Sequence, residues 1–172
     1  NSKNTTVAAS KIAERVATIH ATRFNYHKVL FSNRFTENVS ADFKITGPAG
    51  MIMSALSNLV DNAIFWSRER RAKEGDSFRP AVMVAPDFVH FEGPAILVAD
   101  NGRGFQMDED EMILPFRSLK PDGMGVGLYY TSLVMEIVGG KLLFPPIKTL
   151  ELPRVYDGAC VALVFPSINK EV

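Results

Sequence analysis

Asp100 and the glycines that follow it are the first residues whose types and spacing suggest chemistry. They stand in Asp100-Asn101-Gly102-Arg103-Gly104, directly after the apolar run Ala95 to Ala99, so the carboxylate lies where a buried strand passes into a loop. A carboxylate there can accept a hydrogen bond from an exocyclic amine, which adenine has and guanine replaces with a carbonyl. Gly102 and Gly104 would let the backbone turn sharply and approach a base. Because Asp-Asn-Gly is also common in plain hairpin turns, this segment alone leaves both interpretations open.

A second group is the glycine-rich segment Gly123-Met124-Gly125-Val126-Gly127-Leu128, which precedes an apolar helical run. Free N–H groups at the start of a helix can hold a phosphate. The spacing does not match G-x-G-x-x-G, and the chain has no G-x-x-x-x-G-K-[ST], so Rossmann and P-loop patterns are excluded. Lys120 lies just before the glycines and could reach a terminal phosphate as a point charge. The alternative for Lys120 is an ordinary solvated loop lysine.

Two amides form the third group. Asn58 and Asn62 are four residues apart on a predicted helix, so they project from one face, with Asp61 beside them. Amide and carboxylate oxygens are ligands that Mg²⁺ accepts, and phosphates and waters usually complete its shell. Asn62 is therefore a candidate metal ligand, although these residues could also be the polar face of an amphipathic helix. The three groups together suggest ATP binding.

The composition limits the remaining possibilities. With 172 residues, of which 47% are hydrophobic, the chain fits one compact domain with a substantial core. Its 19 basic and 19 acidic residues balance, so no net field draws it to nucleic acid or to an anionic membrane. No apolar stretch approaches the ~20 residues of a membrane helix, and we expect a cytoplasmic domain. The single cysteine, Cys160, is expected to be a buried strand thiol.

Periodicity and turn residues predict the elements that position these groups. Apolar residues at steps of three and four predict helices over Val7 to about Ala21, about Ala49 to Glu74, and about Gly125 to Val138. Short apolar runs predict a strand toward Phe31 and further strands at Ala81–Ala85, Val89–Phe91, Ala95–Ala99, Lys141–Phe144 and Ala159–Phe165. Residues 33–42 are predicted to be a polar turn region. The stretch 101–124 has no periodicity, which is typical of a functional lid or of disorder.

Four motifs occur in an order that resembles a known superfamily. They are Asn58-x-x-x-Asn62-Ala63, Asp100-x-Gly102-x-Gly104, Pro115-Phe116 and Gly123-x-Gly125-x-Gly127-Leu128. These look like the N, G1, F and G2 boxes of the GHKL ATPase superfamily, and the resemblance covers roughly residues 43–168. The stretch from Pro115 to Lys120 looks specifically like the ATP lid of sensor histidine kinases.

The resemblance implies a fold and a role for each matching residue. The implied fold is α+β, a two-layer α/β sandwich of the GHKL (Bergerat) type, with a mixed, mostly antiparallel sheet covered on one face by helices and a mobile ATP lid. Residues 43–172 would form the catalytic domain, and residues 1–42 a helix and strand that lead into it or belong to the same globular unit. At the base end, the resemblance implies that Asp100 recognises the adenine amino group and that Gly102 and Gly104 shape the base pocket, with Phe105 also in the cofactor site. At the metal end, it implies that Asn62 coordinates Mg²⁺ and that Asn58 supports the metal and the phosphates. Lys120 would approach the γ-phosphate, and the phosphates would be bound by Gly123, Gly125, Val126, Gly127 and Leu128. Asn58 and Lys120 are the candidate catalytic residues.

The chain also departs from the superfamily pattern. Its hydrolases carry a Glu four residues before the metal-binding Asn as general base, and Asn58 occupies that position here with an amide that cannot take a proton. Phe65 stands where histidine kinases commonly have Lys or Arg. The phosphoacceptor His of the family is followed by an acid, and neither His20, His27 nor His90 fits that pattern. We expect His20 on a helix surface and the other two in strands.

The leading hypothesis is therefore the catalytic domain of a sensor histidine kinase in a two-component system. It would position ATP·Mg²⁺ for phosphoryl transfer to a His on another domain or chain. Implied partners are that acceptor domain and a response regulator, with a dimer formed through flanking helices. Two alternatives remain open: a nucleotide-responsive regulatory module without kinase activity, and a GHKL ATPase with another base, such as Asp61 or the lid acids Asp108 to Glu111.

Overall fold

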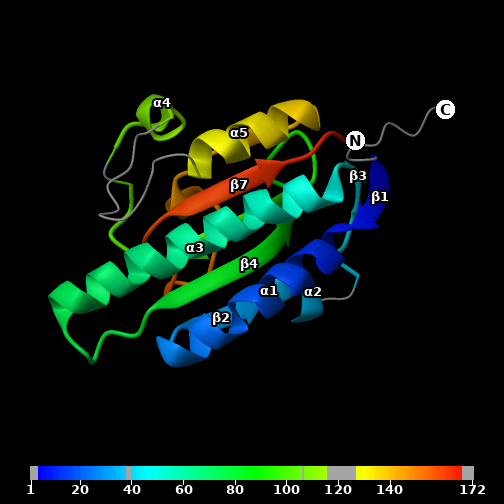
Figure 1. Ribbon diagram of the computed structural model, residues 1–172. Coiled ribbons are helices and arrows are strands. Elements are labelled where there is room, and N and C mark those ends of the chain that lie inside the picture. The colour runs from blue at the N-terminus through cyan, green and yellow to red at the C-terminus, as the bar shows by residue number, and fades with distance from the viewer. Residues whose placement is uncertain (1–3, 38–39, 106, 116–126, 168–172) are drawn as a thin grey trace.

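The computed structural model describes residues 4–37, 40–105, 107–115 and 127–167. A five-stranded sheet in the order β2-β4-β5-β7-β6 carries three helices on one face (Figure 1). The helices are α1 (Ala9–Tyr26), α3 (Ala49–Glu74) and α5 (Gly127–Ile137), and the strands are β2 (Leu30–Asn33), β4 (Ala81–Asp87), β5 (Ala95–Asp100), β6 (Lys141–Leu143) and β7 (Cys160–Val164). β2 and β4 are parallel and the other neighbours antiparallel. The predicted two-layer sandwich with a mixed, mostly antiparallel sheet is confirmed.

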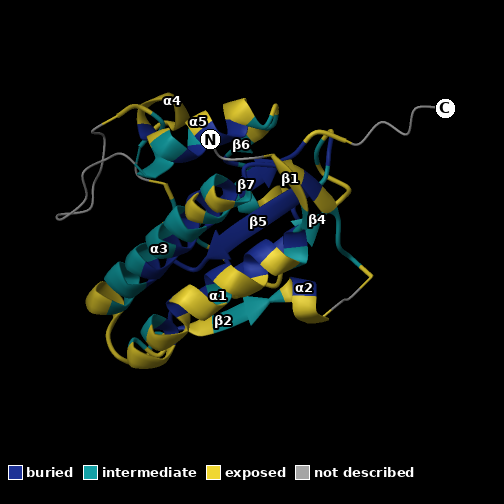
Figure 2. Cartoon of the chain, turned by 45° about the vertical axis from the view of Figure 1, so that its right-hand side comes forward, coloured by how far each residue is buried: buried dark blue, intermediate teal, exposed yellow. Residues whose placement is uncertain are grey.

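The middle strands β4 and β5 are apolar up to their last residue, an Asp in each, and both faces of the sheet are covered there. Val84 and Ile96 pack with the helices. Met83 and Leu97 point to the opposite face, where they form a second cluster with Tyr156 from the segment between β6 and β7. Figure 2 shows β5 as buried throughout, which agrees with its burial by residue. Continuous apolar runs are expected for strands that are buried on both sides.

α3 is the longest helix, and its predicted bounds are confirmed. It begins after Pro48 and ends at Gly75, whose φ of 100° suits glycine and whose N–H donates to the carbonyl of Arg71 at 2.8 Å. α5 ends at Ile137, one residue before the predicted end, and the two glycines that follow close it: Gly139 has a φ of 73°, and the N–H of Gly140 bonds to Met135 O at 2.8 Å. None of the described helices is long and apolar enough to cross a membrane.

Two polar contacts between side chains, His20 with Ser57 and Arg23 with Asp61, connect α1 to α3. His20 is buried, with an exposed fraction of 5%, so the expected surface position was wrong. Its Nε2 lies 2.8 Å from Oγ of Ser57, and Arg23 donates to Oδ1 of Asp61 at 2.6 Å. Burial lowers the pKa of His20, and the neighbouring Arg23 lowers it further. Ser57 and Asp61 thus face α1, which leaves the adjacent Asn58 and Asn62 toward another side of α3.

Several short elements differ from the sequence predictions. Residues 33–42 contain the single-turn helix α2 (Arg34–Glu37), where Thr36 and Asn33 supply local hydrogen bonds. Val89–Phe91 is a bend and not a strand, because Oδ1 of Asp87 accepts hydrogen bonds from the N–H groups of Val89 and His90, each at 2.9 Å. His27 caps the end of α1 and is likewise not in a strand. The sequence analysis also missed the antiparallel pair β1 (Thr5–Ala8) and β3 (Lys44–Gly47), the helix α4 (Glu109–Met112) and the 3₁₀ turn η1 (Ile147–Thr149).

Cys160 is the buried strand thiol predicted from the sequence. Burial raises the pKa of its thiol to about 12, so almost none is thiolate at neutral pH. We expect no reaction with a thiol-specific disulfide reagent in the folded chain and stoichiometric reaction in denaturant. Rapid labelling of the native chain, followed by absorbance, would contradict this placement.

Candidate functional site

One face of α3 carries polar and aromatic residues at steps of four, namely Asn58, Asn62, Trp66 and Arg70. At 1.5 Å per residue, this row extends over roughly 18 Å. At its first end, the start of α5 packs closely, since a Cβ placed on Gly127 would lie 4.0 Å from Cβ of Asn58. Nearer the other end, a Cβ on Gly102 would lie 3.0 Å from Cβ of Trp66. α3 therefore connects the predicted phosphate-binding glycine to the predicted base-binding turn.

Asp100 is the last residue of β5 and is 6% exposed. Its Oδ1 accepts hydrogen bonds from the N–H of Gly102 at 2.7 Å and from the N–H of Ala159 at 3.2 Å. Within the described part of the chain, the other carboxyl oxygen, Oδ2, makes no hydrogen bond. The backbone amides therefore fix the carboxyl group and leave one oxygen available as an acceptor.

The surroundings of Asp100 disfavour its negative charge. Burial is the main cause and raises the pKa of the carboxyl group to about 7. The two backbone hydrogen bonds act in the opposite direction, whereas the nearby charge of Asp157 raises the pKa further. A carboxyl group buried at such a cost, with one oxygen unused, is typical of a functional site.

Two glycines allow the backbone to close around Asp100. Gly104 has a φ of 78°, a conformation that side chains other than glycine rarely adopt. A Cβ on Gly158 would lie 2.5 Å from Oδ1 of Asp100 and 2.5 Å from N of Gly102. Neither Gly158 nor Trp66 was predicted as a site residue from the sequence. Signals were present, because Trp66 follows Asn62 by one helical step of four and Gly158 directly precedes the last apolar run.

Comparison with known proteins gives one curated relative and several solved structures of the same fold. No family model matches the chain. The C4-dicarboxylate transport sensor protein DctB of Rhizobium meliloti is 34% identical over 88 residues, which are 51% of this chain and 13% of that protein. The chain thus corresponds to a small part of that relative's length.

The solved structures match over nearly the whole chain. The nucleotide-free catalytic domain of the histidine kinase ThkA has a TM-score of 0.70 at 17% identity and covers 96% of both chains. The mycobacterial sensor histidine kinase MprB has a TM-score of 0.69 at 18% identity, with 95% of this chain and 97% of that one covered. Full-length ShkA in complex with AMPPNP has a TM-score of 0.65 at 16% identity, with 97% of this chain and 32% of that one covered. This chain has the fold of a sensor histidine kinase catalytic domain.

The remaining predicted residues of this kinase-like fold fall into two groups. Leu128 is partly buried against the core under the helices, and Phe105 is exposed, with its ring edge-on to Phe144 at 5.3 Å between ring centres. The other predicted phosphate-binding residues lie outside the described residues; they are Lys120, Gly123, Gly125 and Val126, together with Phe116 of the F box. Their roles stay predictions from the motif resemblance.

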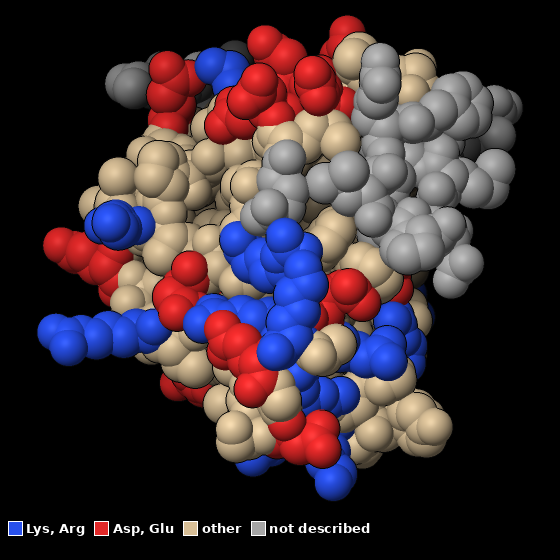
Figure 3. Space-filling model, turned by 90° about the vertical axis from the view of Figure 1, so that its left-hand side faces the viewer, with Lys and Arg blue, Asp and Glu red and all other residues tan. Residues whose placement is uncertain are grey.

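The charges around the site are mixed. In Figure 3, basic side chains gather around the C-terminal end of α3, and acidic side chains gather where α4 lies. Among the described residues, no cluster of three or more His, Cys, Asp or Glu side chains could hold a metal ion by itself. A cation at this site would therefore need amide ligands and oxygens brought by a ligand.

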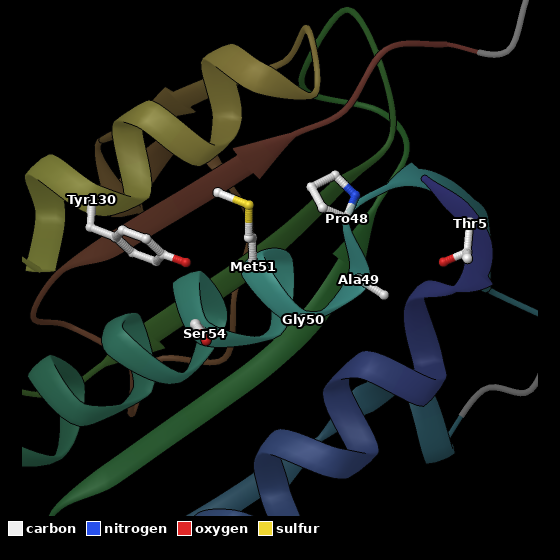
Figure 4. A pocket seen from close by; sticks show the side chains of 7 residues that line it. All are labelled: Thr5, Pro48, Ala49, Gly50, Met51, Ser54 and Tyr130. Carbon is white, nitrogen blue, oxygen red and sulfur yellow. The ribbon is translucent and has the colours of Figure 1, made fainter. Parts of the chain in front are cut away.

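A separate pocket of about 450 Å³ lies at the N-terminal end of α3 (Figure 4). It is lined by Thr5, Pro48, Ala49, Gly50, Met51, Ser54 and Tyr130. None of these is a predicted site residue, and Asn58, the nearest of those on α3, stands one helical turn beyond Ser54. Ser54 in this pocket is therefore a control position for ligand binding on the same helix.

Proposed function

We propose that this chain is an ATP-binding catalytic domain that holds ATP·Mg²⁺ and presents the γ-phosphate to a histidine on another domain or chain. The observation that carries the proposal is the arrangement along α3, which brings the Asp100 turn and the start of α5 to one row of side chains. A nucleotide bound along this row would have its base at the Asp100 turn and its phosphates at the start of α5. The catalytic step would depend mainly on positioning and charge neutralisation.

At the base end, Oδ2 of Asp100 is the acceptor for the exocyclic amine of adenine. Guanine presents a carbonyl oxygen at the corresponding position, and two acceptors would face one another. Gly102 lies against Trp66, so the turn leaves little room for a side chain between them. These features support selectivity for adenine nucleotides.

At the phosphate end, Asn62 is the proposed Mg²⁺ ligand, with Asn58 beside the start of α5. Mg²⁺ usually takes one or two oxygens from protein and the rest from phosphates and water, which fits a site with amides and, among the described residues, no carboxylate cluster. Bound Mg²⁺ would neutralise charge on the β- and γ-phosphates. The N-terminus of α5 at Gly127 offers N–H groups and a favourable dipole to the same phosphates.

Transfer to an external histidine fits better than hydrolysis. Asn58 offers no general base, and Asp61 is held by Arg23 on the α1 side of α3. Two of the three histidines also have other contacts: His20 bonds to Ser57, and His90 bonds to Asp87 at 2.7 Å. The acceptor domain and a response regulator are the proposed partners.

Calorimetric titration tests the proposal. ATP should bind saturably, more tightly with Mg²⁺ than without it, and GTP should not compete at equal concentration. Transfer of ³²P from ATP to an added acceptor domain then separates a kinase from a purely regulatory module. Absence of heat at millimolar ATP with Mg²⁺ would reject the proposed function.

Replacement of Asn62 with Ala tests the metal end alone. We expect affinity for Mg²⁺·ATP to fall roughly tenfold, while affinity for ADP measured in EDTA stays near the wild-type value, because the amide contacts metal and not base. Ser54→Ala, on the same helix but in the separate pocket, is the matched control. An equal loss with and without Mg²⁺ would contradict metal coordination by Asn62.

A further inference from the structure

Arg70 ends the row on α3 and binds two backbone segments that are far apart in sequence. Its Nη1 donates to the carbonyl oxygen of Asn101 at 2.9 Å and to that of Gly102 at 3.5 Å. The same nitrogen donates to Oδ1 of Asp157 at 2.8 Å. Asn101 and Gly102 follow β5, whereas Asp157 precedes β7. One guanidinium nitrogen thus joins the segments that leave β5 and enter β7.

These two segments are the ones that hold Asp100. Gly102 and Ala159 donate their N–H groups to Oδ1 of Asp100, one from each segment. Gly158 donates its N–H to the carbonyl oxygen of Asp100 at 2.9 Å. The direction of the free oxygen, Oδ2, therefore depends on how closely the two segments approach one another.

Arg70 is itself held in place for this role. Its Nε donates to Oε1 of Glu74 at 3.0 Å, and its guanidinium lies over the ring of Phe78 at 4.6 Å from the ring centre. Its side chain is 23% exposed, and its hydrogen bonds to Glu74 and Asp157 raise its pKa, so it stays charged. Those contacts restrict its rotamers, which reduces the entropy lost in holding the two segments.

We propose that Arg70 is a positioning residue for adenine recognition, which clamps the segments on either side of Asp100 so that this carboxyl group presents Oδ2 to the base. The inference rests on the proposed ATP-binding function. The charge of Arg70 has a second effect, because it offsets the negative charge of Asp157 near Asp100. Without Arg70, an unpaired Asp157 disfavours the ionised carboxylate. Among the described residues, the thiol of Cys160 also lies near Asp100, and its raised pKa keeps it neutral.

NMR of the ligand-free chain tests the clamp without nucleotide. Two signals are followed in wild type and in Arg70→Met: the pH midpoint of the Asp100 carboxyl carbon and the hydrogen-exchange rates of the Gly102 and Ala159 amides. In Arg70→Met we expect the midpoint to rise by about one pH unit and both amides to exchange at least tenfold faster. Asp157→Asn should lower the midpoint instead, because it removes the neighbouring charge.

Arg71→Met is the matched control, since Arg71 is the next residue on α3 but its Nη1 donates to the carbonyl oxygen of His27 at 2.7 Å and not to the Asp100 turn. It should leave the midpoint and both exchange rates unchanged. Unchanged midpoint and exchange in Arg70→Met would overturn the proposal.

A parallel titration with ADP separates this proposal from the proposed function. If wild type binds ADP, Arg70→Met should weaken binding about tenfold and shift its pH profile upward, and unchanged affinity would overturn the positioning role. If wild type binds no ADP, the proposed function fails, and adenine positioning by Arg70 is overturned with it.

Discussion

Replacement of Asp100 with Asn is expected to abolish adenine recognition and, at the same time, to stabilise the folded chain above neutral pH. The amide oxygen can still accept the hydrogen bonds of Gly102 and Ala159, but an NH₂ group then replaces Oδ2. The new side-chain NH₂ group and the exocyclic amine of adenine are both hydrogen-bond donors, so they could not pair. We expect a loss of ATP affinity of roughly 100-fold, as for a lost hydrogen bond to a charged group.

The stability gain follows from the raised pKa of Asp100. Between the ordinary pKa of 3.8 and about 7, the folded chain keeps a proton that the unfolded chain releases, so wild-type stability falls as pH rises through this window. At about 1.4 kcal/mol per pH unit, the cost above pH 7 is on the order of 4 kcal/mol. Asp100→Asn removes it, and we expect about 2 kcal/mol or more of added stability at pH 8.5, shrinking toward pH 5.

Urea unfolding and calorimetry on the same samples measure both effects. Asp157→Asn serves as the control for charge, because it changes a neighbouring carboxylate without removing the acceptor. An Asp100→Asn chain that is less stable at pH 8.5, or that binds ATP as wild type does, would refute the role given to this carboxyl group.

Gly158→Ala is expected to be the most damaging single-methyl change near the site. The new Cβ would lie 2.5 Å from both Oδ1 of Asp100 and N of Gly102, and 2.8 Å from the carbonyl oxygen of Gly102. Backbone atoms cannot move aside as a flexible side chain does, so the segments must separate. We expect a loss of about 2–3 kcal/mol, or roughly 5–10 °C in Tm, together with loss of ATP binding.

Gly50→Ala provides the comparison for this prediction. Among the described residues, no atom outside the adjoining turn of the helix lies within 4 Å of a Cβ at Gly50, which stands in the first turn of α3. Alanine there should be neutral or stabilising by up to about 1 kcal/mol. Thermal melts followed by circular dichroism separate the two variants, and equal Tm values for Gly158→Ala and wild type would contradict the close packing around Asp100.

The parts of the fold that the sequence predicted are those with a local cause. α3 follows from apolar spacing between Pro48 and Gly75, and β5 from an uninterrupted apolar run that ends at Asp100. β1 and β3 were missed because each has four residues and their pairing depends on a partner elsewhere in the chain. Val89–Phe91 has strand-forming residues, but the side chain of Asp87 bends the backbone there.

The site residues that could be predicted from the sequence are likewise those with a local signal. Asn58, Asn62 and Asp100 were accessible through side-chain chemistry and helical spacing. For Gly158 the sequence showed only that it precedes an apolar run; its contacts with the Asp100 turn, like those of Arg70 on α3, join segments that come together only in the folded chain. The raised pKa of Asp100 also depends on burial in the assembled sheet and has no local signal.

We propose that one adenine nucleotide lies along α3, with its base at Asp100 and its phosphates at Asn62 and Gly127. A ¹⁵N NMR titration with Mg²⁺·AMPPNP tests it most directly. We predict that the amides of Gly102 and Ala159 shift together with the side-chain amide of Asn62, at one common affinity, while the amides of Thr5 and Ser54 stay unchanged. Shifts confined to Thr5 and Ser54, with Gly102 and Asn62 silent, would place the ligand in the pocket at the N-terminal end of α3 and contradict this placement.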